Sequence, residues 1–129
     1  MVRKILLIED EPQLSEIYSS VLEKNGFEVE VIKYGTQAKE RLQAIYEGQK
    51  ESPDLILLDL ILPDLNGIEI LEESRKHPQT KDIPCFVLTN YSDNELEKRS
   101  AALRAEKFIL KTDYTPQELA DMVKKLFER

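Results

Sequence analysis

The chain has 129 residues, of which 41% are hydrophobic and 33% charged, the composition of one globular domain. Its net charge of −7 argues against a nucleic-acid-binding domain, because affinity for DNA or RNA depends on Lys and Arg neutralising phosphates. A single cysteine, Cys85, excludes an intrachain disulfide and fits a reducing compartment. The first apolar run, residues 5–8, is too short for a signal peptide or a membrane span. We therefore expect residues 1–129 to form one cytoplasmic domain.

Short apolar runs, typical of buried strands, recur along the chain. The expected strands are residues 5–8, 27–32, 55–58, 85–88 and 108–110. The run at 55–58 is the most apolar and is expected at the centre of the sheet.

Helical spacing of apolar residues separates these strands. The first helix has Pro12 in its first turn and ends near residues 25–26, and the third is expected from Ile68 to about Lys76. Capping boxes predict where the last two helices begin. Ser92 and Glu95 form the box of the fourth helix. Thr115 and Glu118 form the box of the fifth helix, which has Pro116 at its first helical position. The expected apolar faces are Leu14, Ile17, Val21 and Leu22 in the first helix; Ala38, Leu42 and Ile45 in the second; Leu96, Ala102 and Leu103 in the fourth; and Leu119, Val123, Leu126 and Phe127 in the fifth.

This alternation predicts an α/β fold in which a five-stranded parallel sheet is sandwiched by five helices. Right-handed crossovers then leave only a few possible strand orders.

Polar residues interrupt the pattern at the carboxyl ends of four strands, where open α/β sheets bind ligands. They are Glu9, Asp10 and Glu11 after the first strand, Asp59 after the third, Thr89 at the end of the fourth and Lys111 at the end of the fifth. Each alone has a simpler interpretation as a turn, cap or solvent-facing residue, and their shared edge is what favours a site. If the first and third strands are neighbours, about 4.8 Å apart, Asp10 and Asp59 come within reach of one cation. Mg²⁺ is the natural candidate, since it prefers carboxylate oxygens.

These residue types are the parts needed for phosphoryl transfer. An Asp carboxylate such as Asp59 can act as nucleophile and form an acyl phosphate. The cation and Lys111 would neutralise the phosphoryl oxygens, and Thr89 could donate its hydroxyl to one of them.

The chain resembles the receiver domains of two-component response regulators, which are chemotaxis-Y-like proteins with a flavodoxin-like fold and strand order 2-1-3-4-5. The matching stretches are residues 5–12 (ILLIEDEP), 53–59 (PDLILLD) with Pro63 and Gly67 downstream, 87–89 (VLT) and 108–111 (FILK). They occur in the family's order and cover essentially the whole chain.

The resemblance implies that Asp59 is the phosphoacceptor. It also implies that Asp10, Asp59 and the backbone carbonyl of Ile61 bind Mg²⁺ directly, with Glu9 acting on the ion through water.

The resemblance further implies that Lys111 pairs with the phosphoryl group. Thr89 and Phe108 would form the switch, Thr89 moving toward the phosphoryl oxygen and the Phe108 ring turning inward.

The implied donor is a phosphohistidine on a sensor histidine kinase or a histidine phosphotransfer domain. The chain would catalyse its own phosphorylation and dephosphorylation without turning over an external substrate. The fourth helix, fifth strand and fifth helix would signal to a protein partner, as a monomer or weak dimer, without direct contact with nucleic acid or membrane. We expect a stand-alone regulator with no output domain.

Three positions depart from the family pattern. Asn90 replaces a small residue at the phosphoryl entrance. Thr112 replaces a proline that follows a cis peptide in the family, so this loop is either trans and rearranged or strained. Arg104 stands where glycine is usual.

Other hypotheses fit the sequence less well. A flavodoxin-like cofactor binder would need a glycine- and hydroxyl-rich loop where this chain has Glu9, Asp10 and Glu11. A phosphatase with an aspartate nucleophile would typically carry a second Asp two residues after Asp59, as the acid, but position 61 is Ile in this chain. A pseudo-receiver that is never phosphorylated remains the main alternative, although such modules usually lack a key site residue.

Three other reactive residues are assigned no chemistry. His77 is expected at the surface near a helix end, and Cys85 in the core. Tyr91 is expected either to overhang the site or to pack within its loop.

Overall fold

The apolar runs form one parallel sheet with the order β2-β1-β3-β4-β5 in the computed structural model, which describes residues 2–128. The strands are β1 (Lys4–Ile8), β2 (Glu28–Ile32), β3 (Leu55–Asp59), β4 (Cys85–Thr89) and β5 (Lys107–Leu110). Every residue of β3 is buried, as expected for a central strand covered on both faces. The predicted fold class, strand order and central strand are confirmed.

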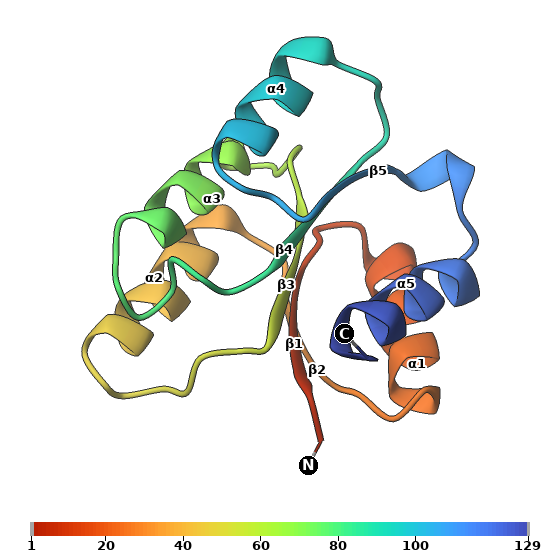
Figure 1. Cartoon of the computed structure of the whole chain (residues 1–129), viewed down its shortest axis with the longest axis horizontal. Coiled ribbons are helices and arrows are strands. Elements are labelled where there is room, and N and C mark those ends of the chain that lie inside the picture. The colour runs from red at the N-terminus through yellow and green to blue at the C-terminus, as the bar shows by residue number, and fades with distance from the viewer. Residues whose placement is uncertain (1, 129) are drawn as a thin grey trace.

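Helices cover both faces of the sheet. They are α1 (Pro12–Lys24), α2 (Gly35–Tyr46), α3 (Ile68–Arg75), α4 (Asn94–Ala102) and α5 (Pro116–Glu128). Figure 1 shows the sheet nearly edge-on, with α1 and α5 on one side and α2, α3 and α4 on the other. None of the helices described within residues 2–128 has the length and apolar character needed to cross a membrane.

Each face of the sheet has its own apolar core, because successive strand residues point to opposite faces. Ile5 and Leu7 of β1 belong to the core beneath α1 and α5, whereas Leu6 and Ile8 belong to the core beneath α2, α3 and α4. All four are at most 1% exposed, and burying one such side chain contributes roughly 1.5–3 kcal/mol. The same alternation decides toward which face the residues that follow each strand point.

The predicted face of α1 is partly wrong. Ile17 is 46% exposed, and Tyr18 and Ser15 are buried in its place. One residue corresponds to about 100° around a helix, so the buried stripe passes through Tyr18 and Leu22 and leaves Ile17 outside. Ser15 tolerates burial because its hydroxyl donates to the Pro12 carbonyl at 3.0 Å.

The fourth helix begins one residue later than predicted. Asp93, not Ser92, is its cap, and one carboxylate oxygen accepts the backbone N–H groups of Glu95 and Leu96 at 3.0 and 3.1 Å. Ala102 is exposed, and Ser100 is the buried residue of α4. The apolar face of α4 is therefore as thin as predicted.

The second capping box is confirmed. Thr115 N–H donates to the Glu118 carboxylate at 2.9 Å, and Glu118 N–H donates to the Thr115 hydroxyl at 3.1 Å. Leu119 and Val123 then face the core as expected.

Candidate functional site

Three acidic side chains meet at the carboxyl edge of the sheet, where β1 and β3 end. Glu9, Asp10 and Asp59 each place a carboxylate oxygen within 4.8 Å of the others. Glu9 and Asp59 continue the alternation of β1 and β3 toward the face covered by α1 and α5. The strand ends therefore gather carboxylates in the way the sequence pattern predicts.

Lys111, directly after β5, reaches back across the edge into this cluster. Its ammonium donates to Glu9 Oε1 at 2.6 Å and to Asp59 Oδ2 at 3.1 Å. The side chains of Glu9, Lys111 and Asp59 are only 0%, 4% and 5% exposed. One ammonium thus pairs with two of the three carboxylates in a largely buried site, and Asp10 lies at the more open side of the cluster.

Burial and charge act in opposite directions on the two residues of this pair. Burial raises the pKa of Glu9 to about 7, although the hydrogen bond from Lys111 lowers it. Burial alone would lower the pKa of Lys111, but its hydrogen bonds and the charges of Glu9 and Asp59 outweigh that effect and raise it. Lys111 therefore stays protonated, and the site holds more negative charge than its single ammonium offsets.

The donor set fits a hard divalent cation. Such ions bind carboxylate oxygens and are often held by one or two carboxylates with water. Glu9, Asp10 and Asp59 offer such oxygens at a spacing that one ion can span.

The loop after β3, residues 60–67, fixes the other oxygen of the Asp59 carboxylate. Ile61 N–H donates to Asp59 Oδ1 at 3.0 Å. Gly67 N–H donates to the Leu60 carbonyl at 2.7 Å, and a Cβ at position 67 would overlap the Asp59 carbonyl oxygen. Glycine at 67 therefore lets the loop close tightly on the end of β3.

The predicted switch residues lie on the other face of the same edge. The Thr89 hydroxyl is paired with the backbone of Tyr91, donating to its carbonyl at 3.3 Å and accepting its N–H at 3.2 Å. The Phe108 ring is half-buried against the core beneath α2, α3 and α4. Among residues 2–128, no hydrogen bond joins Thr89 to Asp59 or Lys111.

The structure describes each departure from the family pattern. Asn90 is exposed. No cis peptide occurs in the described chain, so the bond between Lys111 and Thr112 is trans and leads into a short 3-10 turn, Lys111–Asp113. Arg104 has a φ of 64°, a left-handed conformation that explains why glycine suits this position.

The residues assigned no chemistry have structural partners. The His77 ring stacks on Tyr46 at 3.6 Å between centroids and lies 3.1 Å from the Glu73 carboxylate. Cys85 is buried, which raises the pKa of its thiol to about 12 and keeps it unreactive. Tyr91 is 68% exposed and contributes its backbone to Thr89.

Tyr18, which the sequence pattern did not single out, lies in the core beneath the site. Burial raises the pKa of its hydroxyl, on which the charges of Lys111, Glu9 and Asp59 also act. Tyr18 comes four residues after Leu14 and therefore lies on the same face of the helix, and this spacing was the signal that could have identified it as buried.

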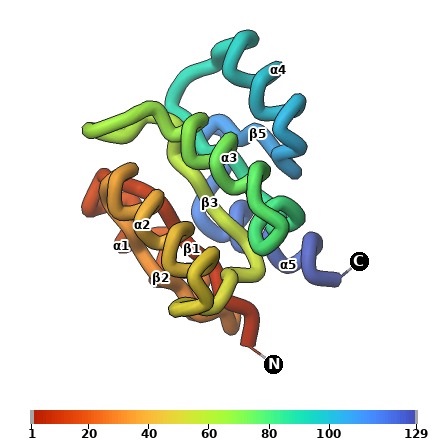
Figure 2. The backbone as a smooth tube through the Cα atoms, turned by 90° about the vertical axis from the view of Figure 1, so that its left-hand side faces the viewer, coloured from red at the N-terminus to blue at the C-terminus, as the bar shows by residue number. Residues whose placement is uncertain are grey.

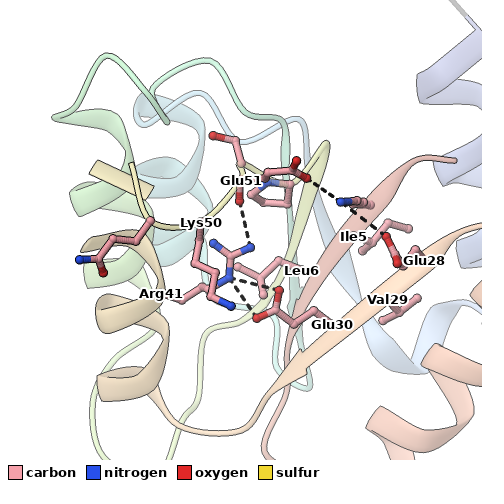
Figure 3. A pocket seen from close by; sticks show the side chains of 12 residues that line it. Ile5, Leu6, Glu28, Val29, Glu30, Arg41, Lys50 and Glu51 are labelled. Carbon is pink, nitrogen blue, oxygen red and sulfur yellow. Dashed lines mark hydrogen bonds and ion pairs between the residues drawn. The ribbon is translucent and has the colours of Figure 1, made fainter. Parts of the chain in front are cut away.

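A hollow of about 510 Å³ lies at the opposite end of the sheet, away from these residues. Figure 3 shows its walls tied together by charged side chains. Arg41 donates to both Glu30 carboxylate oxygens at 3.0 and 3.1 Å and to the Glu51 carbonyl at 3.0 Å. Since Arg41 is held by residues of the chain itself, we assign the hollow a structural role.

The family model of the response regulator receiver domain matches residues 5–124. The chain belongs to the response-regulator receiver family. Receiver domains are signalling switches and do not turn over an external substrate. They use a divalent metal ion, which the acidic cluster of this chain fits, and their family implies a histidine kinase as phosphodonor.

Curated relatives of this receiver domain are longer proteins. The phosphate regulon transcriptional regulatory protein PhoB of Rhizobium meliloti (strain 1021) is 36% identical over the whole chain, which covers 54% of that protein. The DNA-binding response regulator MtrA of Mycolicibacterium smegmatis is 33% identical over the whole chain, which covers 52% of it. The chain spans about half the length of these relatives.

Solved structures share the fold over nearly the whole chain. The phosphorylated cyanobacterial phytochrome response regulator RcpA has a TM-score of 0.83 and 30% identity, and the match covers 99% of this chain and 93% of that one. A CheY-like receiver domain protein of Methanospirillum hungatei JF-1 has a TM-score of 0.84 and 27% identity, with coverage of 99% and 95%.

Proposed function

We propose that this receiver domain is phosphorylated on Asp59 and switches a protein partner in response. The observation that carries the proposal is the setting of the Asp59 carboxylate. One oxygen accepts the Ile61 N–H and the other the Lys111 ammonium, beside two further carboxylates. A nucleophile held in this way needs little reorganisation before it attacks phosphorus.

The phosphodonor is a phosphohistidine on a sensor kinase or a phosphotransfer domain. The Asp59 oxygen forms a bond to phosphorus while the bond from phosphorus to the histidine nitrogen breaks. The electron pair of that bond stays on the imidazole. Lys111 orients Asp59 beforehand and pairs with the phosphoryl oxygens afterwards. Water later cleaves the acyl phosphate, which resets the switch.

Glu9, Asp10, Asp59 and the Ile61 carbonyl would hold Mg²⁺. When bound, the ion supplies positive charge that offsets the charge of the phosphoryl oxygens.

The output follows from the Thr89 hydroxyl. It leaves the Tyr91 backbone and donates to a phosphoryl oxygen, and Phe108 turns into the space behind it. Phosphorylation adds roughly −1.5 to −2 charge, and this local change shifts α4, β5 and α5. The α4 helix buries only Ser100 fully, so it is weakly anchored and suited to move. We place this receiver domain in the cytoplasm, where it acts on a protein effector without itself contacting nucleic acid.

Acetyl phosphate with Mg²⁺ tests the proposal. Intact-mass spectrometry should find one added phosphoryl group on the parent protein and none on Asp59→Asn. Asp54→Asn is the matched control, since Asp54 binds the Lys4 N–H at the opposite end of β3, and it should be modified like the parent. A parent protein that stays unmodified would favour the pseudo-receiver alternative.

A further inference from the structure

The loop of residues 60–67 carries a carboxylate to which phosphoryl transfer assigns no role. Asp64 Oδ1 accepts the Gly35 N–H at 2.8 Å, and Oδ2 accepts the Thr36 N–H at 2.9 Å. These are the first two residues of α2. Figure 2 shows the loop between β3 and α3 reaching toward the end where α2 begins. The residue at the cap position of α2, Tyr34, makes no side-chain cap. The Asp64 carboxylate, which lies 29 residues from Gly35 and 28 from Thr36 in the sequence, does this instead.

The contact between the loop and α2 is close as well as charged. A Cβ at position 35 would overlap the Leu65 side chain, so glycine there lets the loop tip approach. The hydrogen bond from the Thr36 N–H lowers the pKa of Asp64, which stays ionised at neutral pH. Both bonds to α2 are therefore charge-assisted, and the positive end of the helix dipole favours the same charge.

The base of this loop holds the phosphoacceptor. Ile61 donates its N–H to Asp59 Oδ1 and pairs with Asn66 in an antiparallel bridge. Gly67 closes the loop on the Leu60 carbonyl. Because these contacts make the loop a short closed unit, a displacement of its tip changes the position of Ile61 relative to Asp59.

We propose that Asp64 is a positioning residue for the phosphorylation site. By tying the loop tip to α2, Asp64 keeps the Ile61 N–H on Asp59 and the Ile61 carbonyl in place for the metal. The inference rests on the proposed function, because it concerns the same site.

The test measures Mg²⁺ affinity by isothermal titration calorimetry in the full chain. Asp64→Ala should weaken Mg²⁺ binding about tenfold, the loss typical of residues that orient metal ligands. It should also slow acetyl phosphate labelling at a fixed Mg²⁺ concentration. Asp54→Ala is the matched control, because it too removes a carboxylate that accepts a backbone N–H, from Lys4 at 2.7 Å. Its Mg²⁺ affinity should change less than about twofold, since it lies at the opposite edge.

Two further variants keep the test decisive if Asp64→Ala does not fold by circular dichroism. Asp64→Asn retains one acceptor oxygen and should show a smaller loss, while Gly35→Ala displaces the loop tip with Asp64 intact. Parent-like Mg²⁺ affinity in the folded Asp64 and Gly35 variants would overturn the positioning role and leave the proposed function standing. A parent protein that neither binds Mg²⁺ nor accepts a phosphoryl group would overturn both.

Discussion

Lys111 and Glu9 form an ion pair across the carboxyl edge of the sheet, with Nζ 2.6 Å from Oε1 and both side chains almost fully buried. Such a pair is costly to desolvate and is weak evidence for stability in itself. Here it also leaves the charges of Asp10 and Asp59 only partly offset. The site therefore carries excess negative charge, and we expect the stability of the metal-free protein to depend on pH and on added divalent cation.

The stability of the metal-free protein should fall as pH rises from 5 to 8. Glu9 has an ordinary pKa of 4.5 that burial raises to about 7 in the folded state. The folded state then binds the proton more tightly, so this contribution is complete below pH 4.5 and is lost as pH passes about 7. Urea unfolding with a chelator should show a loss on the order of 1–3 kcal/mol from this group.

Glu9→Gln is the control for this pH dependence, since the amide does not titrate. The variant should show a flatter profile than the parent over the same pH range. A parent that instead gains stability with pH relative to Glu9→Gln would mean that Lys111 holds the Glu9 carboxylate ionised throughout.

Asp10→Asn should make the metal-free protein more stable. It removes one of three crowded negative charges at almost constant shape, and we expect a gain of about 1 kcal/mol in the free energy of unfolding. The variant should also lose stabilisation by Mg²⁺, which at tenfold excess over its Kd should amount to about 1.4 kcal/mol in the parent. Urea unfolding with and without Mg²⁺ measures both effects.

Asp82→Asn is the control for Asp10→Asn, because its carboxylate is 77% exposed and its ion pair with Arg104 is long at 3.9 Å. It should respond to Mg²⁺ as the parent does. Equal stabilisation of Asp10→Asn and the parent by Mg²⁺ would place the ion elsewhere.

Run length and helical spacing were enough to predict the strands and helices. The strand order came from the family resemblance, because the crossover rule leaves several orders open. The errors have local causes. The α1 pattern was assigned to Ile17, but Tyr18, one residue further on, lies on the buried stripe with Leu22 and leaves Ile17 exposed. Ser92 and Asp93 are both good caps, so the pattern alone could not choose between them.

The location of the site at the carboxyl edge was also predictable, because parallel strands end together there. The pairing of Lys111 with Glu9 was not, since it depends on how far a long side chain reaches across two other strands. The hydrogen bonds that Asp64 accepts from Gly35 and Thr36 join residues 28–29 positions apart, and no local sequence pattern predicts such a contact.

Arg104→Gly should stabilise the protein by about 0.5–1 kcal/mol. Arg104 has a φ of 64°, where a Cβ costs roughly 1–2 kcal/mol, and glycine relieves that strain at a smaller entropic cost. The side chain itself adds little, because its ion pair with Asp82 is exposed. Thermal unfolding of Arg104→Gly and Arg104→Ala separates the two effects, since alanine keeps the strained Cβ. An alanine variant as stable as the glycine variant would show that backbone strain is not the cause.

Ser100→Ala should raise stability by about 1 kcal/mol and tighten α4 on the sheet. The Ser100 hydroxyl is buried and has no hydrogen-bond partner among residues 2–128. Replacing it removes the cost of an unsatisfied polar group and improves helix propensity. Ser74 is the matched control: it is equally buried, but its hydroxyl donates to the Leu71 carbonyl at 2.8 Å, so Ser74→Ala should be neutral or destabilising.

Hydrogen exchange provides the local measurement for Ser100→Ala. Ser100 is the one fully buried residue of α4, so it is the main anchor of this helix on the sheet. A better-packed residue there should make the α4 amides exchange more slowly than in the parent. If α4 moves when Asp59 is phosphorylated, the tighter anchor should also reduce the change in α4 exchange that acetyl phosphate produces. A Ser100→Ala variant no more stable than Ser74→Ala would mean that the Ser100 hydroxyl finds a partner in solution.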